Sequence, residues 1–296
     1  MRIIFFSLFL GCSSALFAQD DLLSLVSSKE DSNKKEHVTN AFKSSRVIND
    51  HSIEFIGKGI MDVRILHRFG LANSGINNLF GLDQANMRFG FDYGLGKNLT
   101  LGVGRSNVNK EWDGFIKFRP IWQAKGGKWA SPVSVVLVSG ITYTTMPWAD
   151  PERKNFNSSR MAFYHQVIIG RKFNEVFSFQ LAPTFVHRNL VALASESNDV
   201  YALGIGGRIK LSKRTAFVVD YQYVAKGLDK TIYKDPLSIG FDIETGGHVF
   251  QLHFSNSTGM NEKAFITNTT NSWGKGEIRF GFNLSRVFTV SKGKKL

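Results

Sequence analysis

The pair His253 and Ser255 is the arrangement in this sequence that comes nearest to a catalytic one. In an extended chain, residues two apart share a face, and a histidine base can activate a serine hydroxyl as a nucleophile. Phe250, Leu252 and Phe254 alternate with the pair, so we expect an apolar face and a polar face that carries His253 and Ser255. A hydrolase of membrane lipids would need the pair on the apolar face, and no group that orients the histidine is identified. We therefore predict polar wall residues here, and no enzyme.

Two glycine-rich stretches, Gly102-x-Gly104 and Gly204-x-Gly206, superficially resemble phosphate-binding loops. Neither stands between a strand and a helix, the setting in which such glycines bind phosphate, and glycines that let a β-wall bend or pack explain them. The seven histidines show no metal-ligand spacing, and Cys12 is the only cysteine. We predict no metal site and no cofactor.

Charged residues recur at alternate positions in many segments, as they would along one face of β-strands. Arginine and lysine outnumber aspartate and glutamate among them. In a barrel with an open lumen this excess predicts a preference for anions, whereas in a closed lumen the same residues must pair, since buried charges need partners. The predicted lumen-lining residues are Arg64, Arg68, Arg88, Asp92, Arg160, Arg188, Arg208, Asp220, Asp242, His253 and Arg279.

Residues 238–255 show the element that would position these side chains. Phe241 and Ile243 alternate with polar residues or glycine, a period of two that is typical of a β-strand, and Gly246-Gly247 supplies a tight turn before the next alternating run. Similar runs, typically about ten residues long, recur from residue 60 onward. The predicted strands are 60–69, 85–95, 99–106, 112–122, 132–145, 158–171, 177–189, 199–211, 215–224, 237–244, 248–256 and 274–289.

The lengths of runs and connections distinguish a membrane barrel from a soluble two-sheet sandwich. A membrane strand needs about 9–11 residues, whereas a soluble strand averages about 5–6. Short connections such as 212–214 mostly alternate with longer ones such as 146–157, as periplasmic turns and outer loops do in outer-membrane barrels. We predict an all-β, antiparallel up-and-down transmembrane β-barrel of about twelve strands. A sandwich with the apolar face as its core is the alternative.

The ends of the chain predict export. Residues 1–18 have a basic Arg2, an apolar run and small residues before Ala18, as a secretory signal peptide does. Cys12 leaves lipidation as an alternative. We predict a linker or plug segment at 19–58, the barrel at 59–290 and a basic tail at 291–296. The predicted location is the outer membrane of a Gram-negative bacterium.

The net charge of +13 is spread along alternating segments. This distribution predicts attraction to anionic lipid headgroups and a basic lumen rather than nucleic-acid binding. The expected partners are outer-membrane lipid, the barrel-assembly machinery during insertion and small solutes. The predicted function is a narrow channel for small, anionic solutes, and a closed structural or partner-docking barrel without transport is the alternative.

Five segments carry long, specific phrases of sequence: Arg46–Ser52 (RVINDHS), Gly81–Arg88 (GLDQANMR), Pro183–Leu190 (PTFVHRNL), Asn198–Arg208 (NDVYALGIGGR) and Gly240–Thr267 (GFDIETGGHVFQLHFSNSTGMNEKAFIT). They resemble a Bacteroidota family of uncharacterised outer-membrane β-barrel proteins that is filed under a domain of unknown function. The resemblance implies an outer-membrane barrel with a signal peptide, and it implies no activity and no functional residues.

Overall fold

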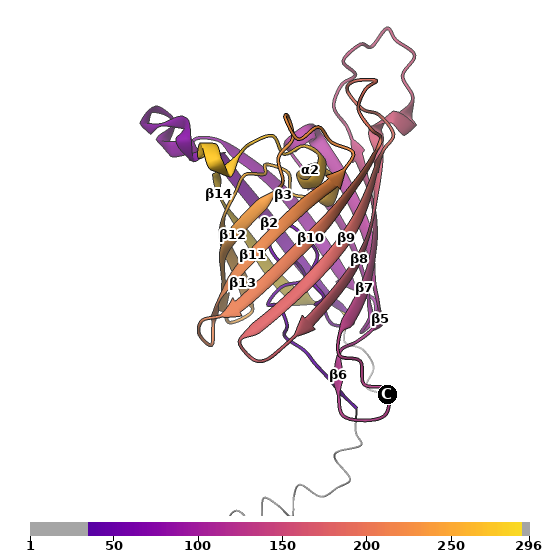
Figure 1. Cartoon of the computed structure of the whole chain (residues 1–296), viewed down its shortest axis with the longest axis vertical. Helices are drawn as coiled ribbons and strands as arrows, with labels where there is room; N and C mark the ends of the chain where they lie inside the picture. Colours follow the sequence, from indigo (N-terminus) through magenta and orange to yellow (C-terminus); the bar gives the residue numbers. More distant parts are fainter. Residues whose placement is uncertain (1–34, 292–296) are drawn as a thin grey trace, which may run out of the picture.

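The structure, a computed structural model, describes residues 35–291. The predicted fold is confirmed: the strands form a closed antiparallel barrel in which each pairs with its neighbours in chain order and β14 closes on β2 (Figure 1). The barrel strands are β2 (Ile60–Leu71), β3 (Ala85–Gly94), β4 (Leu99–Ser106), β5 (Glu111–Ile121), β7 (Ser134–Thr144), β8 (Met161–Lys172), β9 (Phe177–Arg188), β10 (Asp199–Lys210), β11 (Thr215–Lys226), β12 (Leu237–Thr245), β13 (His248–Ser255) and β14 (Arg279–Thr289). The predicted signal peptide, Cys12, the start of the linker and the tail from 292 lie outside the described residues.

Alternation along each strand builds two different faces. In β3, Phe89 and Phe91 point outward and are 47% and 48% exposed, whereas Arg88 and Asp92 point inward and are buried. A period of two allows this separation because successive side chains of a strand point to opposite sides. The outer surface is therefore an apolar belt, and most of the charged residues of the wall face the lumen.

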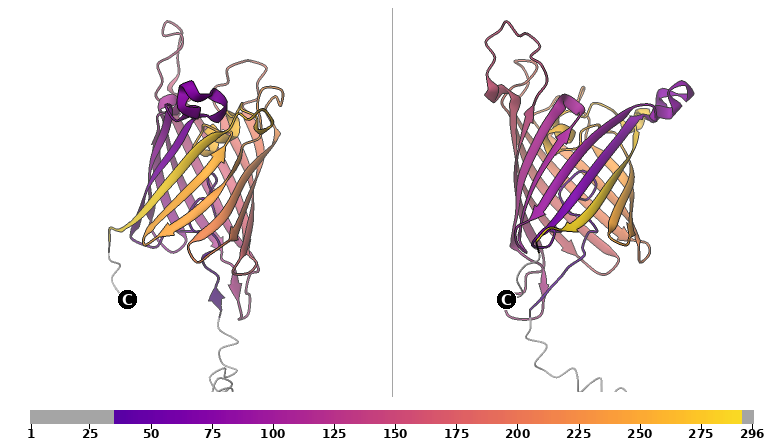
Figure 2. Two further views of the ribbon diagram at one scale, coloured as in Figure 1. Left: turned by 90° about the vertical axis from the view of Figure 1, so that its left-hand side faces the viewer. Right: turned by 180° about the vertical axis from the view of Figure 1, so that it is seen from behind.

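The two ends of the barrel differ. The short turns lie at one end of the barrel, where the last strand, β14, also ends. The two-stranded sheet of β1 (Glu36–His37) and β6 (Ala124–Lys125) and both ends of the described chain lie at this same end (Figure 2). The opposite, long-loop end carries the short helices. These are η2 (Ala72–Ser74), η3 (Ile76–Gly81), η4 (Val108–Lys110), η5 (Asn157–Arg160), α2 (Glu262–Thr267) and η6 (Trp273–Lys275). No helix within residues 35–291 is both long and apolar enough to cross a membrane.

Two predicted strands begin three or more residues later than expected. The last one was expected from 274, but Trp273 begins η6 and donates through Nε1 to the Leu237 carbonyl at 2.9 Å, and Gly276 is left-handed at φ 68°. Extended structure starts at Arg279 as a result. In the same way η5 takes Arg160 out of β8, which begins at Met161.

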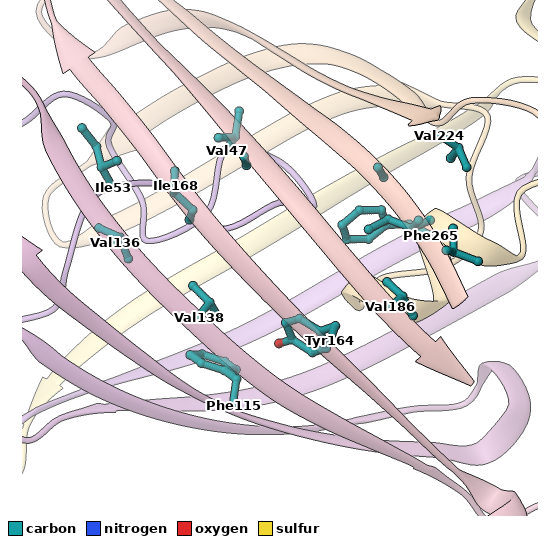
Figure 3. Packing of buried hydrophobic residues seen from close by; sticks show 14 of the residues in the cluster. Val47, Ile53, Phe115, Val136, Val138, Tyr164, Ile168, Val186, Val224 and Phe265 are labelled. Carbon is teal, nitrogen blue, oxygen red and sulfur yellow. The ribbon is translucent and has the colours of Figure 1, made fainter. Parts of the chain in front are cut away.

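The interior is not uniformly polar. One sector of the wall, from β5 to β11, contributes an apolar cluster that includes Phe115, Val138 and Ile168 (Figure 3). Phe265 of α2 and Val47 from the segment before β2 pack into the same cluster. The barrel therefore encloses a core, part apolar and part charged, and this core includes chain segments that are not part of the wall.

Candidate functional site

Residues 41–56, here called the luminal loop, lie inside the barrel. The chain enters from the short-turn end and returns there to start β2 (Figures 1 and 2). The loop folds back on itself, because Ser52 N donates to the Ser45 carbonyl at 3.0 Å and Val47 N donates to the Asp50 carbonyl at 2.8 Å. Val47 and its neighbour Ile48 are fully buried. The tip of the loop thus reaches deep into the lumen.

Asp220 of β11 receives the tip of the loop. Its Oδ2 accepts three consecutive backbone N–H groups, from Ile48 at 3.3 Å, Asn49 at 2.7 Å and Asp50 at 2.8 Å. Successive N–H groups that converge on one point form an anion-binding nest. The carboxylate satisfies donors that would otherwise be buried without partners, which is costly.

Wall amides satisfy the carbonyl groups of the loop. Gln251 Nε2 donates to the Val47 carbonyl at 2.6 Å, and Gln180 Nε2 donates to the His51 carbonyl at 2.6 Å. The loop has no β-ladder with the wall, so its backbone depends on these side chains.

Three of the predicted lumen-lining arginines contact the loop. Arg64 and Arg68 come from β2 and Arg208 comes from β10, and each donates to a loop oxygen, so the loop is held from two parts of the wall. The contacts are Arg64 Nη1 to Ser45 Oγ (2.9 Å), Arg68 Nη2 to Asn49 Oδ1 (2.7 Å) and Arg208 Nη1 to the Ala41 carbonyl (3.3 Å).

Residues 256–269, here called the luminal cap, close the lumen from the long-loop end, where α2 lies within the mouth of the barrel (Figure 1). Asn261 caps α2: its Oδ1 accepts from Ala264 N at 2.8 Å, as N-cap side chains do. Asn261 Nδ2 and Lys263 Nζ each donate to a different oxygen of Glu111 at 2.7 Å. The cap is thereby fastened to the start of β5.

The loop and the cap meet at one buried junction. Arg46 Nη1 of the loop donates to Glu262 Oε1 of the cap at 2.5 Å, and His51 Nε2 lies 3.1 Å from the same oxygen. The ring of Phe115 packs edge-on against His51 at 4.5 Å. Arg46, Glu262 and His51 are each at most 1% exposed. Segments that enter from opposite ends of the barrel are therefore joined by a buried ion pair.

Burial and neighbouring charges set the protonation of the loop, which does not itself span the membrane. Burial lowers the pKa of Arg46, but the Glu262 carboxylate and other acidic neighbours raise it by more, so the guanidinium stays charged. Burial and then the Arg46 charge hold the pKa of His51 well below its usual value, so the imidazole is neutral. Burial and the nearby Asp220 raise the pKa of Asp50 from 3.8 to about 8. Gln166 and Gln222 donate to the Asp50 carboxyl at 2.7 and 3.0 Å.

Two of the other inward candidates bond within the wall, whereas a third, Asp92, has no partner for its Oδ1 among the described residues. Arg88 forms a bidentate ion pair with Asp113, in which Nε lies 2.8 Å from Oδ1. Asp242 accepts from Gln251 at 2.9 Å, and Asp92 is buried on the inward face. Buried charges paired in this way act as internal struts.

Three candidates lie at the long-loop rim. Arg188 donates to the Ser197 carbonyl at 2.6 Å, and Arg279 donates to Asn271 Oδ1 at 3.1 Å. Arg160 does not line the lumen: it sits in η5, with its guanidinium 3.8 Å from the centroid of the Trp148 ring. The period-two assignment failed there because a short helix interrupts the extended chain.

The histidine–serine pair of β13 does not form a catalytic contact. His253 and Ser255 are buried inside the barrel, both ring nitrogens of His253 lack a hydrogen-bond partner among residues 35–291, and Ser255 Oγ accepts from Ser238 at 2.8 Å. The structure brings no acceptor to the imidazole and turns the hydroxyl toward β12.

A second histidine–serine pair, unnoticed in the sequence, lies on the outer surface. Ser139 of β7 and His165 of β8 are cross-strand partners, with Oγ 3.0 Å from Nδ1. No ion pair links His165 to a carboxylate among the described residues, and the surrounding N–H groups belong to the barrel ladder. The pair therefore has no orienting acid and no oxyanion donor, which serine hydrolysis needs.

The junction residues Arg46, His51 and Glu262 were not singled out from the sequence. They lie in two of the segments that carry the family resemblance, and this was the available signal. Within residues 35–291 no group of three or more His, Cys, Asp or Glu side chains is arranged to hold a metal ion.

Comparison with known proteins supports the architecture. Residues 42–288 match the family described as "Membrane bound beta barrel domain (DUF5777)". No curated protein matches the chain.

Among solved structures, the NanC porin is 8% identical with a TM-score of 0.47, and the match covers 78% of this chain and 100% of the porin. OmpF of Salmonella typhi is 8% identical with a TM-score of 0.35, covering 78% and 98%. The translocator domain of the autotransporter NalP from Neisseria meningitidis is 12% identical with a TM-score of 0.35, covering 79% and 89%. Similarities at this level carry no argument about function.

Proposed function

Because the chain belongs to the family of membrane bound β-barrel domains, we propose that it is an outer-membrane barrel held closed by its own chain, serving as a structural or partner-docking module. In a closed barrel every strand has a neighbour on both sides, so the backbone hydrogen bonds are satisfied within lipid. The strands of 8 to 12 residues are long enough to cross the hydrocarbon core of a membrane. The outer membrane is the membrane in which barrels of this kind reside. Origin in Bacteroidota stays a prediction.

The single observation that carries the closed state is the junction of Arg46 with Glu262. It joins the luminal loop to the luminal cap at the centre of the lumen, and neither partner is exposed beyond 1%. A barrel of about twelve strands has an interior too wide for wall side chains alone to fill, whereas eight strands leave just enough room for them. The loop and the cap occupy that additional space.

Single-channel conductance in a planar bilayer tests this proposal. We expect the full-length barrel to show no discrete steps, and a variant in which glycine–serine linkers replace both the loop (residues 41–56) and the cap (residues 256–269) to conduct. In that variant Arg64, Arg68 and Arg208 lose their loop partners, so the steps should prefer anions.

The matched control is a variant in which the connection at residues 126–130 is shortened. This connection lies outside the barrel, next to β6 (Figure 1). The control should remain as silent as the full-length barrel. Discrete steps of equal size in the full-length barrel and the replacement variant would contradict closure.

A second candidate function is a gated narrow channel for small anionic solutes. One observation favours it: the loop enters and leaves through the same end, so it can be withdrawn without threading (Figure 2). Brief anion-selective openings of the full-length barrel, absent when a disulfide fixes the loop to the wall, would support the channel over the permanently closed barrel.

A further inference from the structure

The outer surface of β3, β4 and β5 is hollowed near the long-loop end. A groove of about 700 Å³ is lined by apolar side chains that include Phe89, Phe91 and Trp112, with Val103 between them. Val103 pairs with Phe91 on one side and with Gly114 on the other. A Cβ added to Gly114 would meet only a backbone oxygen at 3.6 Å. Val103 and Gly114 are smaller than the neighbouring Phe91 and Trp112, and this difference in size produces the groove.

Two cations stand at the upper end of the groove. Arg105 is the outward partner of both Phe89 and Trp112, and its guanidinium lies 5.1 Å from the centroid of the Trp112 ring. Its hydrogen bonds go to the Lys110 carbonyl at 2.9 Å and to Thr145 at 3.4 Å. Lys110 also lines the groove. Among residues 35–291 neither cation forms an ion pair with a carboxylate.

We propose that this groove binds one phosphorylated lipid of the leaflet at the long-loop end. An acyl chain lies along Phe89, Phe91 and Val103, and the phosphate of the headgroup is held by Arg105 and Lys110. Charge complementarity selects this occupant: the apolar floor matches a hydrocarbon chain, and the paired cations at the rim match an anionic headgroup. A neutral apolar partner would leave both cations without a counter-charge.

An outward arginine over an aromatic ring can also be a simple interface anchor. Arg171 supplies the comparison, because it stands over Phe173 at 5.1 Å near the short-turn end. Arg171 does not line the groove, and neither does Phe173. The proposal therefore predicts that Arg105 and Arg171 differ in lipid selectivity although each guanidinium lies 5.1 Å from the centroid of an aromatic ring.

Native mass spectrometry of the detergent-purified, full-length barrel tests the proposal. The probes are phosphatidylglycerol, phosphatidylcholine with the same acyl chains, and inorganic phosphate. We expect one retained phosphatidylglycerol and, in the double variant Arg105→Gln with Lys110→Gln, a loss of affinity of about tenfold as two charge-assisted contacts disappear. Arg171→Gln should bind like the unmodified barrel. Val103→Phe fills the groove and should weaken both lipids.

Three results would overturn the proposal: unchanged phosphatidylglycerol retention in the double variant, an equal loss in Arg171→Gln, or displacement of the lipid by inorganic phosphate alone. Heat-modified gel migration shows whether each variant is folded. If the double variant does not fold, Val103→Phe decides, since unchanged lipid retention with a filled groove contradicts the site.

Discussion

The luminal loop and the luminal cap both fill the lumen, but they are held by different means. The backbone of the loop is satisfied by wall side chains: Asp220 takes three of its N–H groups, and amides such as Gln251 take its carbonyls. The cap contains its own helix, with Phe265 N donating to the Asn261 carbonyl at 2.9 Å. Side chains such as Asn261 fasten it to the wall, together with one long backbone bond from Asn256 N to the Leu237 carbonyl at 3.4 Å. The loop should therefore depend on the wall for its conformation, whereas the cap depends on it only for position.

The largest expected effect is a loss of stability in the luminal loop and the luminal cap at the same time. Glu262→Gln removes the charge that pairs with Arg46 and leaves the guanidinium buried without a counter-charge, which costs about 3–5 kcal/mol. Hydrogen–deuterium exchange should speed up in peptides that cover 44–52 and 260–268. Replacing Arg46 and Glu262 together by methionine should cost less than the sum of the single changes.

Glu175→Gln is the matched control, because Glu175 is 79% exposed and its 2.8 Å pair with Lys172 lies outside both the loop and the cap. Exchange that stays unchanged in Glu262→Gln would mean that the junction does not couple the two regions.

A smaller effect, confined to the loop, should show that the loop and the cap are supported independently. Asp220→Asn weakens the acceptor for three loop N–H groups, at a cost of about 1–3 kcal/mol, and touches no cap residue. Exchange at residues 48–50 should accelerate while residues 261–268 keep their rate. Asp92→Asn, at an equally buried inward aspartate with no hydrogen bond to the loop or to the groups that hold it, should leave both unchanged. Acceleration of the cap in Asp220→Asn would contradict independent support.

A third effect concerns pH. The pKa of Asp50 is raised to about 8 in the seated loop from 3.8 when released, so the seated carboxyl holds a proton that the released one loses. Its stabilisation is complete below about pH 4 and is lost as pH rises to about 8. Exchange at residues 47–52 should therefore quicken between pH 6.5 and 8.5.

Asp50→Asn stays neutral throughout this range and should lose that part of the pH dependence. Gln166 and Gln222 can accommodate the new amide, since the Oε1 atoms of both lack partners among the described residues. His51, whose lowered pKa acts in the opposite direction and chiefly below about pH 6.5, is present in both proteins, so the difference between them isolates Asp50. Equal slopes would show that Asp50 does not titrate in this range.

The strands were predictable to within a few residues, because alternation is local. The run predicted at 177–189 is β9 at Phe177–Arg188, and the run at 248–256 is β13 at His248–Ser255. Errors arose where a short helix interrupts extended chain, at Arg160 and before Arg279. The apolar sector of the lumen was also missed, although Val135–Val138 is apolar on both faces of its strand and could have indicated a wall covered on its inner side.

By itself, the sequence determined the period of two, the two faces of the wall, the order of the strands and the inward position of most of the charges. These properties follow from backbone geometry over a few residues. Only the tertiary structure decided which charges meet: Arg46 and Glu262 are 216 residues apart and enter from opposite ends. Their contact depends on the closure, stagger and width of the whole barrel, which no local pattern specifies.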